Sequence, residues 1–183
     1  MTTLSLLTRT HLENALTPTE LRATKIVRIA LMSGILPFYF VIILLYLQNG
    51  HAGMVQTDTS LMGTLSLIHA CFALIAAGGA FYLPKIQMRK EYLSRAAAGL
   101  SVEKIAAKAV QLHRASTVMM MAPIEGAAFF GGAICMIGVV DGTMGQETAY
   151  WLNTLSGVVL VGIGLLTFPT RENVLGSLER AFL

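Results

Sequence analysis

The sequence predicts an all-α integral membrane protein whose four transmembrane helices form two hairpins, with amphipathic helices at the cytoplasmic face. Of the 183 residues, 55% are hydrophobic and only 13% are charged, whereas a soluble domain has about 25% charged residues. The apolar residues form four blocks long enough to cross a bilayer, at roughly residues 26–47, 61–83, 117–140 and 149–168. We therefore expect a single membrane domain over residues 1–183, with no room for a separate soluble domain.

The positive charges predict the orientation of these spans. All 13 Lys and Arg residues lie in the N-terminal segment, in the basic segment 85–114 or in the C-terminal tail. The positive-inside rule then places both termini and the basic segment in the cytoplasm, as in a multi-pass protein of the bacterial inner membrane. There the basic residues are expected to meet anionic lipid. This distribution accounts for the net charge of +3 without a nucleic-acid partner.

The first span follows a clear helix start. Thr17 can cap the helix, Pro18 suits its first position, and Glu20 stands where a capping box needs its acid. Pro37 lies inside the span and predicts a kink that frees a backbone carbonyl. Ahead of this helix, residues 1–16 place leucines among polar residues, which fits either a short interfacial helix or a loosely ordered terminus.

The second span follows a polar loop at residues 48–60 and is expected to end at Pro84. It carries His69 and a patch of Ala and Gly at residues 76–80, and such small residues allow neighbouring helices to approach closely. Within the basic segment, Ser101 begins a predicted amphipathic helix, because apolar residues then recur at helical spacing. We expect this helix to run without a break into the third span.

The fourth span has Tyr150 and Trp151 at its outer end, where an aromatic belt is expected. It ends at Pro169. The last residues then form a short amphipathic tail, whose predicted apolar face consists of Val174, Leu175, Leu178 and Phe182.

The two halves of the chain share a pattern. Residues 30–38 of the first span parallel residues 122–130 of the third, and residues 81–84 parallel residues 166–169. This pattern predicts two helical hairpins of the same orientation that arose by internal duplication. A chance match between two apolar spans is the alternative interpretation.

A single carboxylate, Glu125, lies near the middle of the third span, where the duplicated pattern has Ser33 in the first. An ionisable group in hydrocarbon is a functional-site hypothesis by default. Glu125 lies roughly 15 Å from the cytoplasmic face at about 1.5 Å per residue. His69 also lies near the midplane, so a Glu125–His69 pair is feasible. Removal from water favours the protonated carboxyl, and a protonated His69 favours the ionised form. The pair is therefore a candidate proton- or ion-binding site. The other reading is a protonated Glu125 that holds a neighbouring helix.

The run Ala122-Pro-Ile-Glu-Gly-Ala-Ala-Phe-Phe-Gly131 resembles the carboxylate helix of proteolipid (c-type) subunits of rotary ATPases. Together with Phe168-Pro169 it also resembles uncharacterised bacterial four-span membrane proteins that carry a Glu-Gly-Ala helix. The resemblance to the proteolipids implies that Glu125 carries a transported proton or cation.

Other chemistry finds little support in the sequence. There is no phosphate-binding loop, HExxH motif or cysteine–histidine cluster, and no second histidine lies at the depth of His69. We expect no enzyme activity, no metal and no cofactor. Cys71 and Cys135 both fall in apolar runs, where packing as small hydrophobic residues is favoured over a disulfide.

Small residues on the third and fourth spans suit tight helix contacts, within the chain or with other subunits: Ala122, Gly126, Gly131, Gly132, Gly157, Gly162 and Gly164. The expected function is therefore a small non-catalytic subunit of a larger membrane assembly. Its partners would be the lipid bilayer and other integral membrane subunits or copies of itself. The alternative is a proteolipid-like subunit that translocates protons or cations through Glu125.

Overall fold

The computed structural model describes residues 6–49, 59–96 and 98–183. Within these residues the regular structure is helical, and four helices are long and apolar enough to cross a membrane: Pro18–Gln48, Ser60–Gln87, Val102–Val140 and Thr148–Leu166. The predicted all-helical class is confirmed, and the four long apolar helices coincide with the four predicted apolar blocks, which supports a multi-pass membrane protein. Most of the predicted polar loop, at residues 50–58, lies outside the described residues.

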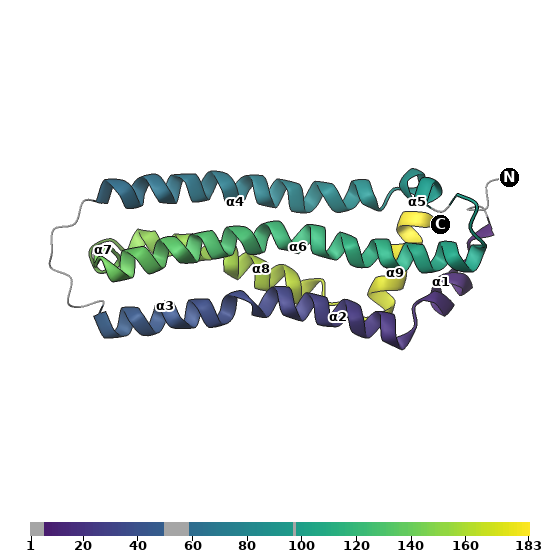
Figure 1. Ribbon diagram of the computed structural model, residues 1–183, viewed down its shortest axis with the longest axis horizontal. Coiled ribbons are helices and arrows are strands. Elements are labelled where there is room, and N and C mark those ends of the chain that lie inside the picture. Colours follow the sequence, from purple (N-terminus) through teal and green to yellow (C-terminus); the bar gives the residue numbers. More distant parts are fainter. Residues whose placement is uncertain (1–5, 50–58, 97) are drawn as a thin grey trace.

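The described residues form nine α-helices and the 3₁₀ helix η2, and the α-helices are labelled in Figure 1. In chain order they are α1 (Arg9–Ala15), α2 (Pro18–Ser33), α3 (Ile35–Asn49), α4 (Thr59–Gln87), α5 (Lys90–Ala96), α6 (Val102–Val140), α7 (Thr143–Gln146), η2 (Thr148–Thr154), α8 (Leu155–Leu166) and α9 (Arg171–Phe182).

The first span is interrupted where α2 meets α3. The break lies at Gly34, whose N–H still bonds the carbonyl of Ala30 at 3.0 Å. Pro37 causes the interruption, because its ring has no N–H for the carbonyl of Ser33 and crowds that carbonyl. The helix therefore restarts one turn ahead, with Pro37 in the first turn of α3, where a missing N–H costs little. The predicted kink is present and lies on the N-terminal side of the proline.

The second span extends further than predicted. The expectation that it ends at Pro84 is wrong, because α4 continues to Gln87. The proline removes one donor to the preceding turn, yet its own carbonyl accepts a bond from the Met88 N–H at 2.9 Å. One lost hydrogen bond near the end of a long helix is therefore tolerated.

The central element is α6, a continuous helix of 39 residues that passes through Pro123. The predicted run from the basic segment into the third span is confirmed, and Ser101 occupies the N-cap position. Every other described helix packs against α6. Within the most apolar 18-residue stretch of each spanning helix, 50% of α6 is buried, whereas the other three spans have 11%, 17% and 22% buried.

Figure 1 shows α6 lying between α4 and the α2–α3 pair. The first two spans therefore pack mainly on α6 rather than as a closed hairpin in the described part of the chain. The fourth span packs on α6 as well, and it starts as the 3₁₀ helix η2 before continuing as α8. The predicted duplication stays a prediction.

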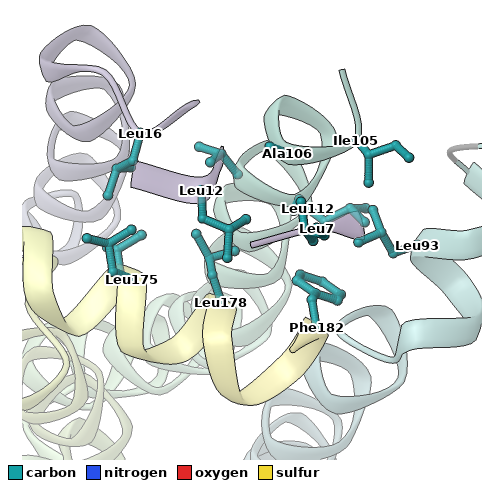
Figure 2. Packing of buried hydrophobic residues seen from close by; sticks show 13 residues of the cluster. Leu7, Leu12, Leu16, Leu93, Ile105, Ala106, Leu112, Leu175, Leu178 and Phe182 are labelled. Atoms are coloured by element: carbon teal, nitrogen blue, oxygen red, sulfur yellow. The ribbon is translucent and has the colours of Figure 1, made fainter. Parts of the chain in front are cut away.

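An apolar layer closes one end of the bundle (Figure 2). Side chains from residues 7–16, α5, α9 and the first turns of α6 form this terminal cluster, which comprises Leu7, Leu12, Leu16, Leu93, Ile105, Ala106, Ala109, Val110, Leu112, Val174, Leu175, Leu178 and Phe182. Leu7, Leu12 and Leu16 thus pack on the protein itself, whereas Leu6 is exposed. The tail forms α9, and its four predicted apolar residues are all buried here.

The helix start at Thr17 forms as half of a capping box. The Thr17 hydroxyl accepts a hydrogen bond from the Glu20 N–H at 3.2 Å. The Glu20 carboxylate, however, pairs with Arg114 of α6 at 2.8 Å. This ion pair fastens α2 to the central helix.

Candidate functional site

Glu125 lies half-buried on α6, next to the break between α2 and α3. A Cβ atom placed on Gly34 would lie 2.8 Å from its Oε1 atom, so the glycine provides the space for the carboxyl. In the described part of the chain, Glu125 has no hydrogen-bond or ion-pair partner. The one carboxyl of the spans thus sits against a helix break without a fixed partner.

His69 of α4 is buried, with 5% of its surface exposed, and it has a complete set of partners. Its Nδ1 atom lies 2.9 Å from Asn153 Oδ1, and its Nε2 atom lies 3.0 Å from the Ala127 carbonyl and 3.2 Å from Ser156 Oγ. The Asn153 amide donates to the Tyr150 carbonyl at 2.9 Å, which fixes its oxygen toward the histidine. The Asn153 oxygen and the Ala127 carbonyl are both acceptors, and they lie at opposite nitrogens of the His69 ring. The ring joins three spans.

The structure does not bring Glu125 and His69 together. Glu125 faces Gly34, whereas His69 contacts α6 at Ala127 and beside Gly131. Two residues of an α-helix differ by about 200° in direction, so positions 125 and 127 point to different neighbours. Because α6 separates α4 from the α2–α3 pair, no hydrogen bond or ion pair joins the two groups among the described residues.

The predicted small residues divide into two sets. Four glycines lie where a Cβ atom would collide with another helix: Gly131 against Asn153 and His69, Gly132 against Phe38 and Tyr39, Gly157 against Tyr39, and Gly164 against Met32. The other three face outward: Ala122 is exposed, and Gly126 and Gly162 have open space where a side chain would go. Packing within the chain therefore uses the first set only.

Arg28 of α2 was not singled out from the sequence, yet it is buried with 4% of its surface exposed. Its guanidinium donates to the carbonyl and hydroxyl oxygens of Thr167 and reaches Thr117 Oγ1 at 3.5 Å. The Nε atom is buried without a partner, and no carboxylate pairs with Arg28 among the described residues. The signal in the sequence was its position within the first span, between Ile26 and Ile29.

An open cavity of about 810 Å³ lies beside Arg28, at the end of the bundle that carries the terminal cluster. Residues from α2, α4, α6 and α9 and the end of α8 line it. Three of the lining residues are cationic, namely Arg28, Lys85 and Arg180, and no Asp or Glu lines it. Hydroxyl, amide and imidazole groups complete the polar lining: His113, Ser116, Thr117, Thr167, Asn173 and Ser177.

The cysteines are free thiols: Cys71 is exposed on α4, and Cys135 is buried on α6. No cluster of three or more His, Cys, Asp or Glu side chains that could hold a metal ion occurs among the described residues.

The four long apolar helices indicate a multi-pass α-helical membrane protein. Comparison with protein-family models, with curated proteins and with solved structures found no match to this chain. The resemblance of the Glu125 helix to rotary ATPase proteolipids therefore stays a prediction.

Proposed function

We propose that this protein is a small non-catalytic subunit of a larger membrane assembly. The observation that carries the proposal is the Glu125 carboxyl, which has no partner in the described part of the chain. A polar group without a hydrogen bond in hydrocarbon costs several kcal/mol. A donor on a helix of another subunit would satisfy the carboxyl and fix the register of the contact.

The surface beside Glu125 suits such a contact. The outer face of α6 consists of exposed residues at helical spacing: Val118, Met119, Ala122, Gly126, Phe129 and Ile137. Ala122 and Gly126 are four residues apart, and this spacing of small residues lets two helix backbones approach closely. The open space at Gly126 means that the chain itself does not use this position.

The partners we propose are other integral membrane subunits or further copies of this chain. The charge distribution supports an orientation with both termini cytoplasmic in a bacterial inner membrane, where the basic segments meet anionic lipid. The terminal cluster would then lie at the cytoplasmic ends of the spans.

Purification from native membranes in a mild detergent, with mass analysis of the intact complex, tests the subunit proposal. We expect a complex of defined composition, and we expect Gly126→Leu to dissociate it because the new side chain blocks close approach. Gly78→Leu is the matched control, since Gly78 is an exposed helical glycine on α4 with nothing within 4 Å. A lone wild-type protein, or equal loss in both variants, would contradict the proposal.

The alternative function is translocation of protons or cations by Glu125. It is favoured by the position of the carboxyl at the α2–α3 break, because Pro37 leaves the Ser33 carbonyl without its helical donor. The Ser33 carbonyl would then accept a hydrogen bond from the protonated Glu125 carboxyl in the middle of the membrane. A translocating Glu125 should react with a hydrophobic carbodiimide more slowly as pH rises.

Flux separates the two functions. In proteoliposomes, ion translocation requires a flux that Glu125→Gln abolishes. The subunit proposal expects no flux from the purified wild type, and it expects Glu125→Gln to retain partners because the amide still forms hydrogen bonds.

A further inference from the structure

We propose that the cavity beside Arg28 binds the phosphate-bearing headgroup of an anionic phospholipid. The cavity lies at the ends of two apolar helices, because Lys85 and Met88 at the end of α4 and Leu166 and Thr167 at the end of α8 line it. In a bilayer, lipid headgroups lie at the ends of the spans. The inference stands independently of the proposed subunit function.

The charge of the cavity selects for an anion. Three cationic side chains line it and no carboxylate does, so their attraction for an anion is not offset within the lining. Lys85 and Arg180 are exposed and form no ion pair in the described part of the chain. Both are therefore available to a ligand at the mouth of the cavity.

The interior of the cavity holds a buried cation with one donor that lacks an acceptor. Arg28 is 4% exposed, and its Nε atom is buried without a partner among the described residues. Ser116 and Thr117 also line the cavity, and their hydroxyl groups donate hydrogen bonds to the His113 carbonyl. A guanidinium binds phosphate oxygens through fixed, charge-assisted hydrogen bonds, so a phosphate group would satisfy the buried cation that the protein leaves without a counter-ion.

The apolar part of the lining favours a lipid over free phosphate. Met88, Met120 and Leu166 share the cavity with the cations. Leu166 is 86% exposed and directs apolar surface outward from the end of α8. A phospholipid matches both halves of this lining, because its phosphate meets Arg28 while its acyl chains continue along the spans.

The test is thermal melting of delipidated protein in detergent, titrated with phosphatidylglycerol, phosphatidylcholine or inorganic phosphate. We expect phosphatidylglycerol alone to raise the melting temperature in a saturable way. Lys85→Gln/Arg180→Gln should weaken its apparent affinity by at least about tenfold, since each interfacial cation contributes to anionic-lipid binding. Both residues are exposed, so the variant should fold without lipid as the wild type does.

Arg95→Gln/Lys104→Gln is the matched control, because it removes two exposed positive charges outside the cavity. Ser177→Asp places a carboxylate in the lining and should abolish the response, whereas Ser177→Asn should retain it. Equal responses to the two phospholipids, or equal weakening by the control, would overturn the proposal. Saturable stabilisation by inorganic phosphate alone would also overturn it, since the ligand would then be a soluble phosphate.

Discussion

At the scale of single residues, Glu125 and Arg28 differ in how visible they are in the sequence. Glu125 could be predicted because it is the one acid in a long apolar run. Arg28 follows Arg22 and Lys25 on the same helix, so the sequence suggests that it is the last of three solvent-exposed basic residues. The structure turns Thr24 and Arg28 inward and leaves Ile26 and Ile29 exposed. In a membrane the apolar face of a helix meets lipid, which reverses the pattern of a soluble helix.

His69 gives a direct test at this scale. His69→Ala removes the hydrogen bonds to Asn153 and Ser156 and leaves the Asn153 oxygen without this partner. We expect the free energy of unfolding to fall by about 2 kcal/mol, measured by unfolding in a denaturing detergent. Cys71→Ala is the control on the same helix, where an exposed side chain should matter by less than about 0.5 kcal/mol. Equal effects of the two changes would show that the contacts of His69 do not stabilise the fold.

At the scale of elements, the existence and length of the spans were predictable, and the effects of their prolines were less so. Pro37 interrupts its helix, whereas Pro84 and Pro123 lie inside continuous helices. Each proline removes the same backbone donor. What differs is the place of each proline: Pro123 lies in α6, which every other described helix contacts, and Pro84 lies near the end of α4. Pro37 lies in the α2–α3 pair, on one side of the bundle. That difference depends on tertiary contacts, which cannot be predicted from the local sequence around each proline.

The two kinds of glycine on α6, packed and open, predict different responses of stability to one added methyl group. At Gly131 a Cβ atom would collide with the Asn153 carbonyl and the His69 ring, whereas nothing lies within 4 Å at Gly126. Gly131→Ala should therefore lower the free energy of unfolding by about 1–3 kcal/mol. Gly126→Ala should change it by less than about 0.5 kcal/mol. Detergent-unfolding curves of both variants measure this, and the reverse order would contradict the described packing of α6.

At the scale of the whole molecule, composition and block length predicted a four-span helical protein. The spatial order of the spans was not predictable. Chain connectivity suggested that neighbouring spans pair, yet α6 lies between the first and second spans. The predicted Glu125–His69 pair does not form for a related reason. The two residues lie at a similar depth, but they lie on different sides of α6. The cavity beside Arg28 is lined by residues from five helices or their ends, so no local sequence motif predicts it.

The central claim is that the outer face of α6 contacts another membrane protein. The most direct measurement replaces Gly126 with a photoreactive amino acid and illuminates intact native membranes. The account predicts a cross-linked polypeptide of defined mass at this position. At Leu74, which is 74% exposed on α4, it predicts lipid adducts only. Lipid adducts alone at both positions would contradict the subunit function and move the explanation of Glu125 to ion translocation.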